Sequence, residues 1–362
     1  MEIKYLKQAI KLAEQARGKC SPNPFVGCVI VKDDHVVGQG FTQAWGQDHA
    51  EVQALKKAGD LAKGADLYVT LEPCSHYGKT PPCAKAIIKA GISRVFIGIK
   101  DPNPLVAGKG IAMLKEAGIK VKCNLLVAEI SHQLESFLTY IQKDRPFVFI
   151  KSAVSLDGKI ADDCGNSKWI TNETSRERVH QLRAEADAII TGVATVNRDD
   201  AMLNVRLADY QGKQPFRIVL DYDLDIRLDS QLVLSSPNIT SIIYTCHKQL
   251  NSAKAQILKN YKIELRSAES NGENFILKNI LKQLKDDNIS LLMVEAGPRL
   301  VSSFVKEDLV DKLYYFIAPS LIGGCNSAFR DIGVPDISCK KDLRLYSTEI
   351  FDEDLLLVYY FN

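Results

Sequence analysis

Three residues of the types that bind zinc stand within the first quarter of the chain. His49 is followed two residues later by Glu51, Cys74 comes directly after a proline, and Cys83 follows a pair of prolines of the kind that starts helices. A catalytic zinc takes three protein ligands and leaves a fourth position for water, whose pKa then falls to about 7. His49, Cys74 and Cys83 would supply such an open set of ligands.

A carboxylate beside the metal would complete this chemistry. Glu51 could carry protons between the attacking water, a ring nitrogen and a departing amine. The pattern H-x-E followed by P-C-x-x-C is typical of cytidine and adenine deaminases, in which the Glu is the acid/base and not a ligand. The chain departs from this pattern because eight residues, not two, separate Cys74 from Cys83. Two other interpretations stay open: a buried thiol pair beside a core histidine, and a structural zinc with His76 as its fourth ligand.

The elements around these residues are expected to alternate between strand and helix. β-Branched runs predict strands, and periodic apolar residues followed by glycine predict helices. The expected strands cover 25–31, 67–71, 94–99 and 119–125, and the expected helices cover 50–58, 84–90 and 111–117. This alternation is typical of βαβ units and predicts a largely parallel sheet covered by helices.

The pattern changes near 142–146, a charged stretch ending in proline that we interpret as a linker. Beyond it a helix is expected over 173–184, and strands are expected over 147–154, 188–191, 217–220, 241–245, 291–295, 313–317 and 354–361. The sequence therefore predicts two α/β domains, 1–144 and 146–362, the second with more strands and an antiparallel edge.

Composition argues against several classes of protein. The chain has 46 Lys and Arg against 44 Asp and Glu, a net charge of +2, without the basic excess of nucleic-acid binders. Its longest apolar run, 355–361, is far shorter than the roughly 20 residues of a membrane-spanning helix. The amphipathic start of the chain is unlike a signal peptide, and nine scattered cysteines do not suggest a disulfide framework. We expect a cytoplasmic homo-oligomer without nucleic-acid or membrane partners.

The motifs of the first domain resemble the bifunctional deaminase/reductase family of riboflavin biosynthesis, in which an N-terminal pyrimidine deaminase is fused to a C-terminal reductase. Residues 21–31 are similar to its P-N-P-x-V-G-C strand, and residues 71–83 carry its extended cysteine spacing. Residues 101–104 and 108–110 form a third matching block. The resemblance implies a cytidine-deaminase-like three-layer domain fused to a dihydrofolate-reductase-like α/β domain.

The resemblance also implies roles for single residues of the first domain. Zinc would be bound by His49, Cys74 and Cys83, with Glu51 as the proton shuttle. The substrate would be 2,5-diamino-6-(5-phosphoribosylamino)pyrimidin-4(3H)-one, contacted by Asn23, His76, Lys79 and Asn103. Without the resemblance, Asn23 could equally cap a turn and Lys79 could be one more solvated lysine. A deaminase acting on a flipped nucleic-acid base is an alternative that the near-neutral charge disfavours.

The second domain begins with a strand that runs into S-L-D-G and resembles the reductase domain of the same family. No G-x-G-x-x-G follows a strand, so a Rossmann dinucleotide site is not supported. The resemblance implies contacts to NADPH from Ala153, Trp169, Thr195, Asp199, Gly297, Pro298 and Arg299. It implies contacts to the substrate from Ser167, Arg183, Leu203, Arg206 and Glu295.

Hydride transfer to C1′ of the sugar would open its ring and give 5-amino-6-(5-phosphoribitylamino)uracil. Lys151, expected at the end of a strand, and Glu295 could polarise the sugar hydroxyls and handle the proton. The open alternatives are a lysine that only reaches solvent, and surface ion pairs for Arg183 and Arg206. The chain departs from the family at Ala201, where a proline is expected in the D-D-P-x-L motif.

Overall fold

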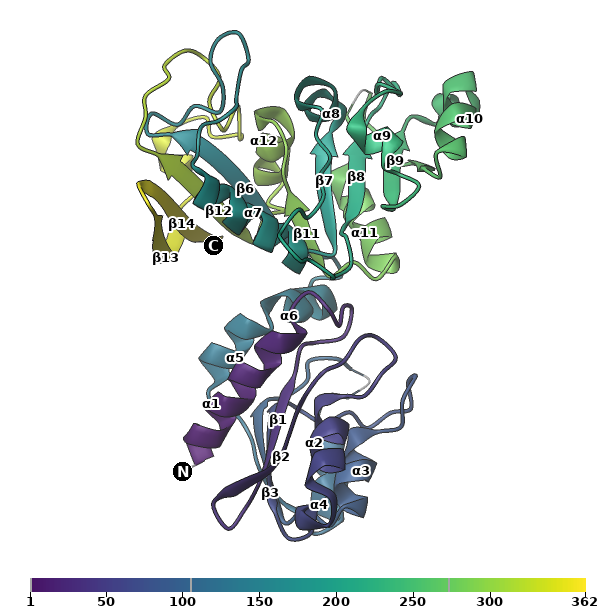
Figure 1. The fold of residues 1–362 in the computed structure, drawn as a ribbon, viewed down its shortest axis with the longest axis vertical. Helices are drawn as coiled ribbons and strands as arrows, with labels where there is room; N and C mark the ends of the chain where they lie inside the picture. Colours follow the sequence, from purple (N-terminus) through teal and green to yellow (C-terminus); the bar gives the residue numbers. More distant parts are fainter. Residues whose placement is uncertain (1, 105, 273) are drawn as a thin grey trace. The chain divides into compact units, whose positions relative to one another are not determined.

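The computed structural model describes residues 2–104, 106–272 and 274–362. The chain divides into two compact units, Met1–Arg145 and Pro146–Asn362, so the boundary falls within the stretch interpreted as a linker. Each unit has its own sheet and its own hydrophobic core (Figure 1). No helix among the described residues has both the length and the apolar character needed to cross a membrane.

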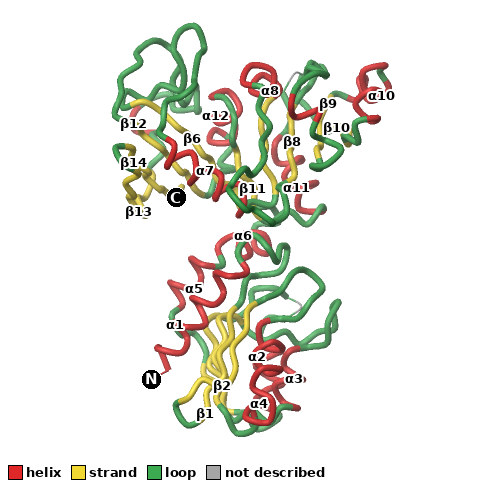
Figure 2. The backbone as a smooth tube through the Cα atoms, in the orientation of Figure 1, coloured by secondary structure: helices red, strands yellow, loops and turns green. Residues whose placement is uncertain are grey.

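The first unit is a three-layer α/β/α sandwich. Its five strands are ordered β2-β1-β3-β4-β5, with bounds Gly27–Lys32 (β1), His35–Phe41 (β2), Asp66–Leu71 (β3), Arg94–Ile99 (β4) and Lys120–Lys122 (β5). Its helices are Glu2–Ala13 (α1), Ala50–Ala58 (α2), Cys83–Lys89 (α3), Lys109–Glu116 (α4), Val127–Gln133 (α5) and Glu135–Gln142 (α6). Helices α1 and α5 lie on one face of the sheet and α2, α3 and α4 on the other (Figures 1 and 2).

The prediction of a largely parallel first sheet is wrong at one edge. Strands β3, β4 and β5 are parallel, but β1 pairs antiparallel with both β2 and β3. The missed strand β2 contains Gly38 and Gly40, where a side chain would meet the Ala54 and Ala50 carbonyl oxygens at 2.3 and 2.4 Å. Close packing of α2 therefore requires glycines that interrupt the β-branched pattern of a strand. The strand expected over 119–125 is also shorter, with only three residues in β5.

The second unit is built on a nine-stranded sheet ordered β10-β9-β8-β7-β11-β6-β12-β14-β13. The bounds are Phe147–Ser155 (β6), Ala188–Gly192 (β7), Phe216–Leu220 (β8), Ser241–Thr245 (β9), Glu264–Ser267 (β10), Leu291–Val294 (β11), Lys312–Ala318 (β12), Leu343–Phe351 (β13) and Asp354–Phe361 (β14). All neighbours from β10 to β12 are parallel, and β14 and β13 add antiparallel strands. This arrangement confirms the antiparallel edge, although the sequence did not predict β10 or β13.

Helices cover both faces of the parallel strands, which explains why most residues of the central strands are apolar. The helices are Glu173–Glu185 (α7), Val193–Asp199 (α8), Gln231–Leu234 (α9), Ala253–Asn260 (α10), Leu277–Asp286 (α11) and Pro298–Lys306 (α12). Residues of α7, α8, α9 and α10 share a core with Phe147 and Phe149 on one face of the sheet. Residues of α11 and α12 share a core with Val148 and Ile150 on the other face. Packing on both faces leaves the ends of the strands for ligands.

Candidate functional site

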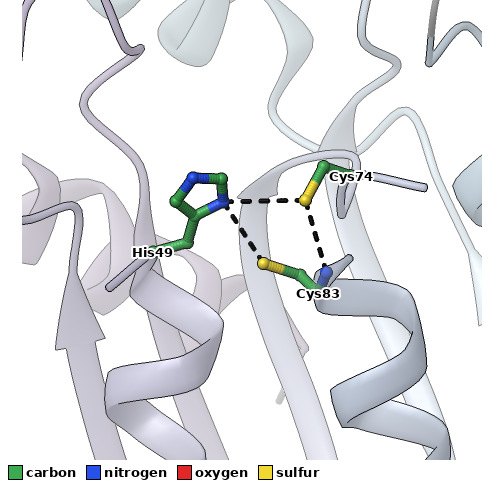
Figure 3. Close-up of side chains that lie close together, drawn as sticks. All are labelled: His49, Cys74 and Cys83. Atoms are coloured by element: carbon green, nitrogen blue, oxygen red, sulfur yellow. Dashed lines mark hydrogen bonds between the residues drawn. The ribbon is translucent and has the colours of Figure 1, made fainter. Parts of the chain in front are cut away.

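The three expected zinc ligands come together in the first unit (Figure 3). His49 is the residue before α2, Cys83 is the first residue of α3, and Cys74 lies in the segment after β3. Nδ1 of His49 lies 3.6 Å from Sγ of Cys74 and 3.3 Å from Sγ of Cys83. Tetrahedral bonds of about 2.0 Å to nitrogen and 2.3 Å to sulfur would separate such atoms by about 3.5 Å, so the three side chains fit a zinc ion.

The ligand set is open on its fourth side. Among the described residues, no fourth His, Cys, Asp or Glu joins the group formed by His49, Cys74 and Cys83. His76, which a structural zinc site would need as a further ligand, is exposed in the loop between the two cysteines. Three protein ligands and a free position are the arrangement of a catalytic zinc rather than a structural one.

The two cysteines differ in how readily they ionise. The Cys83 backbone N–H at the start of α3 donates to Sγ of Cys74 at 3.3 Å. Hydrogen bonds from the Cys83 thiol and from His49 hold the pKa of the Cys74 thiol well below its usual range. The thiol of Cys83 has a raised pKa, because it forms a hydrogen bond with the sulfur of Cys74 and is buried. The site therefore favours one thiolate before any metal binds, and a metal charge would favour the second.

Glu51 lies in the first turn of α2 and is only 4% exposed. Burial raises the pKa of its carboxyl to about 7, against an opposing effect of His49. A carboxyl that titrates near neutrality can both accept and donate a proton at the working pH of an enzyme. Its position two residues from a metal ligand therefore suits a proton shuttle.

A second buried carboxylate, Glu72, follows β3 directly. It connects the segment that carries Cys74 to residues 101–104 and 108–110, the third block that matches the family. Its side chain accepts hydrogen bonds from the backbone N–H groups of Asp101, Gly108 and Ile111, at 3.3, 3.0 and 3.1 Å. Asp101 in turn accepts the N–H of Asn103 at 2.8 Å. These bonds fix the segment that carries Asn103 beside the end of β3.

The other expected substrate contacts of the first unit lie in irregular segments. Asn23 is half-buried, and its backbone N–H donates to the Cys20 carbonyl in the turn before β1. Lys79 is exposed, with its Nζ 3.2 Å from the centroid of the Trp45 ring. Within the described part of the chain, no hydrogen bond or ion pair joins Asn23 or Lys79 to the metal ligands, so their part in binding stays a prediction.

The second unit contains a cavity of about 1070 Å³. It lies where β7, β8 and β11 end, the usual ligand position in a parallel sheet. Every residue predicted for this domain lines it: Lys151, Ala153, Ser167, Trp169, Arg183, Thr195, Asp199, Leu203, Arg206, Glu295, Gly297, Pro298 and Arg299. The cavity thus collects residues that lie far apart in the sequence.

A charged cluster occupies one side of this cavity. Glu295 accepts hydrogen bonds from Arg183 Nε and Nη2 at 2.8 and 2.9 Å, and from Lys151 Nζ at 3.3 Å. Burial alone would raise the pKa of Glu295, but Arg183 and Lys151 lower it below its usual range. Lys151 lies in the middle of β6, not at its end, and its ammonium does not simply reach solvent as the alternative would have it. Glu295 therefore stays ionised and holds both cations in the cavity.

Arg206 differs from Arg183 in its partners. Its Nη1 donates to the Asn204 side chain at 2.6 Å, and no carboxylate within the described part of the chain forms an ion pair with it. Burial and the nearby Arg183 both lower the pKa of Arg206. An exposed guanidinium at the cavity wall without a carboxylate partner suits an anionic group such as a phosphate.

The remaining cavity wall offers a flat aromatic surface and a helix start. The Trp169 ring is 68% exposed, with the Arg176 guanidinium 4.5 Å from its centroid. Gly297 precedes Pro298, the first residue of α12, and its N–H donates to Thr195 Oγ1 at 3.2 Å. Sequence reasoning missed further lining residues, among them Arg176, Arg198, Asp221, Tyr222, Asn274 and Arg330. Asp221 follows β8 directly and could have been found from its place at a strand end, whereas Arg330 lies in an irregular segment that carries no periodic signal.

Comparison with known families agrees with the geometry of both units. Residues 1–99 match the cytidine and deoxycytidylate deaminase zinc-binding region, and residues 146–357 match the RibD C-terminal domain. The chain is thus a zinc-binding deaminase unit followed by a reductase unit of the dihydrofolate-reductase-like fold.

Relatives extend the match over the whole chain. It is 43% identical to the riboflavin biosynthesis protein RibD of Aquifex aeolicus over 98% of this chain and 97% of the relative. The Escherichia coli RibD protein is 39% identical over 88% of each chain. A solved structure of Acinetobacter baumannii RibD superposes with a TM-score of 0.91 at 37% identity, covering 100% of this chain and 99% of that one. The chain belongs to the RibD family, the bifunctional deaminase/reductases of riboflavin biosynthesis.

Proposed function

We propose that residues 1–144 hydrolyse the ring amine of 2,5-diamino-6-(5-phosphoribosylamino)pyrimidin-4(3H)-one and that residues 146–362 then reduce its ribosyl group with NADPH. The product would be 5-amino-6-(5-phosphoribitylamino)uracil. The presence of a three-ligand metal centre in one unit and a cationic cavity in the other carries this proposal. A solved Thermotoga maritima structure is titled a diaminohydroxyphosphoribosylaminopyrimidine deaminase/5-amino-6-(5-phosphoribosylamino)uracil reductase. It is 35% identical, with a TM-score of 0.88, over 100% of this chain and 99% of that one.

In the deaminase unit, His49, Cys74 and Cys83 would hold the zinc ion. Bound zinc acts as a Lewis acid and makes water nucleophilic at neutral pH. Glu51 takes a proton from the attacking water, passes it to the adjacent ring nitrogen, and assists the protonation of the departing amine. Water is consumed, the ring gains a carbonyl and ammonia leaves. The pKa of about 7 for Glu51 supports this double role.

Recognition in the deaminase unit would depend on polar side chains around the metal. Asn23 and Asn103 offer both donors and acceptors to the edge of the heterocycle. His76 and Lys79, in the exposed loop between the cysteines, would face the ribose and the phosphate.

In the reductase unit, NADPH supplies the hydride when it is bound. Ala153, Trp169, Thr195, Asp199 and the Gly297-Pro298-Arg299 turn would hold this cofactor, and Trp169 offers a flat surface for it. Ser167 and Leu203 would contact the substrate, and Arg206 would bind its phosphate.

The proton for the opened sugar ring would come from Lys151. C1′ gains the hydride, the bond from C1′ to the ring oxygen breaks, and that oxygen takes a proton. Glu295 cannot provide this proton because Arg183 and Lys151 keep it ionised. Its role is to hold the Lys151 side chain in position at the cavity wall.

The test of this proposal is a pair of assays on zinc-loaded protein with the diaminopyrimidine substrate. Ammonia should be released without NADPH, and NADPH should be oxidised only after deamination. Oxidation of NADPH at an equal rate with the starting compound and a blocked deaminase would contradict the proposed order. A homo-oligomeric state and a cytoplasmic location also belong to the proposal, and light scattering of the purified protein tests the first of them.

A further inference from the structure

Arg217 is a buried cation that lies outside the cavity. It is on β8 with no exposed surface, and it does not line the cavity. No ion pair joins it to a carboxylate within the described residues. Its guanidinium instead donates to neutral oxygens, namely the hydroxyls of Ser235, Ser236 and Ser241 and the carbonyls of Met202, Leu232 and Ile239. Burying a charge without a counter-charge is costly, so a use for this arrangement is expected.

Met202 belongs to an irregular segment, 200–206, that carries predicted substrate contacts. Leu203 and Arg206 from this segment line the cavity. Leu203 has a φ of 49°, the left-handed region that a leucine rarely adopts. Such a conformation persists only where the surroundings fix it, because it is unfavourable by itself.

This segment is neither a helix nor a strand. Its backbone is held by hydrogen bonds from side chains in other parts of the chain. The Met202 carbonyl accepts from Arg217 Nη1 at 3.1 Å. The Val205 N–H donates to Gln214 Oε1 at 2.8 Å, and the Val205 carbonyl accepts from Gln214 Nε2 at 3.0 Å. Leu203 therefore lies between two anchored backbone positions, and Arg206 directly follows the second.

Neither anchor touches the space that a ligand would fill. Arg217 and Gln214 are absent from the cavity wall, whereas Arg183, which also bonds the segment through the Asn204 carbonyl, lines it. Guanidinium has five donors in a fixed fork, so one side chain can hold Met202 while it also binds the turn that follows α9. Lysine, with three donors on a flexible stem, could not satisfy this set.

We infer that Arg217 and Gln214 are positioning residues of the reductase, which fix segment 200–206 so that Leu203 and Arg206 face the phosphoribosyl substrate. This inference rests on the proposed function of the second unit. It also explains how the segment stays ordered with Ala201 in place of the expected proline: side chains fix the backbone where a pyrrolidine ring would otherwise do so.

The test compares Arg217→Lys and Gln214→Ala with a matched control, Ile218→Ala, in the full-length protein. Ile218 is a buried residue of the same strand that packs in the core on the other face of the sheet, away from Leu203, so its truncation destabilises β8 without removing a contact of the segment. Both anchor variants should raise KM for the phosphoribosyl substrate about tenfold, with KM for NADPH and the deaminase rate unchanged. Ile218→Ala should lower the melting temperature and leave both KM values as in the wild type. Equal KM values for the control and the anchor variants would overturn the inference, as would an unchanged KM in Gln214→Ala where Arg217→Lys does not fold.

A second readout does not depend on activity. Hydrogen exchange at the amides of 202–206 should be faster in both anchor variants than in Ile218→Ala, and unchanged exchange would overturn the inference. If the wild-type protein oxidised no NADPH with the deaminated substrate, the proposed function would fail, but the exchange comparison would still decide whether these side chains anchor the segment.

Discussion

Glu295 accepts two hydrogen bonds from the Arg183 guanidinium, at 2.8 and 2.9 Å, across 112 residues of the chain. This paired geometry leaves Nη1 of Arg183 to bind the Asn204 carbonyl. Lys151 reaches the same carboxylate from β6. The Glu295 carboxylate therefore connects β6, α7 and segment 200–206 at the cavity wall. Its negative charge is the first property to test.

Replacing Glu295 by Gln is expected to lower the turnover of the reductase by about a hundredfold, because a neutral amide no longer forms the ion pair that positions Lys151. The two partly buried cations would also lose their counter-charge, at a cost of about 3 kcal/mol to the second unit. Steady-state kinetics with the deaminated intermediate and thermal unfolding measure the two effects. Glu185→Gln, which removes an ion pair with Arg178 outside the cavity, is the matched control. Full reductase activity in Glu295→Gln would refute this role.

Replacing Glu51 by Gln should reduce ammonia release by at least about 10²-fold, because the amide cannot accept and return a proton. Zinc content should stay at the wild-type level, since the three ligands are unchanged. Metal analysis and an ammonia assay of the same sample check both outcomes. Glu116→Gln on the exposed side of α4 controls for loss of a carboxylate. A variant that keeps its zinc and still releases ammonia at the wild-type rate would sink the assigned role.

Removing the metal should separate the two activities. Replacing Cys83 by Ser is expected to weaken zinc binding by more than about 100-fold, because a ligand of the metal itself is lost. Ammonia release should stop, and reduction of the deaminated intermediate should continue because its cavity lies in the other unit. Cys123→Ser, a half-buried cysteine outside the metal group, should change neither. Loss of both activities on chelation would show that the reductase unit also depends on metal.

The stability of the first unit should depend on pH through Asp101. Burial raises the pKa of this carboxyl from 3.8 to about 6, and repulsion from Glu72 adds to the effect. Because the folded state binds the proton more tightly than the unfolded state, this contribution is present below about pH 4 and is lost as the pH rises through 6. Its size is about 2 kcal/mol. Asp101→Asn keeps an acceptor for Asn103 and should abolish this part of the pH dependence. Hydrogen exchange of β3 and β4 amides between pH 4 and 7 measures the difference, and identical profiles for variant and wild type would contradict the assignment.

Local sequence patterns were sufficient for the metal centre. His49 and Glu51 share one helix start, and each cysteine stands beside prolines that mark a chain turn, so three short motifs carried the chemistry. The strand β2 was missed for a physical reason. Glycines stand at 38 and 40 because α2 packs too closely for a side chain there, and glycine is not a residue that predicts a strand. The Asp33-Asp34 turn, with φ of 49° and 61°, was the local signal of a hairpin that could have revealed it.

The reductase cavity could be predicted only through the family resemblance. Lys151, Arg183 and Glu295 come from distant parts of the chain, and no spacing in the sequence connects them. The role of Arg217 could not be predicted from the sequence, because a single arginine in an apolar strand only interrupts the hydrophobic pattern. Its partners are backbone carbonyls and serines that only the folded chain brings together.

One chain is expected to carry out two chemical steps, deamination and then reduction, in a fixed order. Mass spectrometry of the phosphoribosyl diaminopyrimidine after incubation with zinc-loaded protein tests it directly. Without NADPH, the compound should exchange one amine for oxygen and change no further. With NADPH, the same product should then gain two hydrogens. Reduction of a compound that still carries both amines, or an unchanged substrate in the presence of zinc and NADPH, would contradict the account.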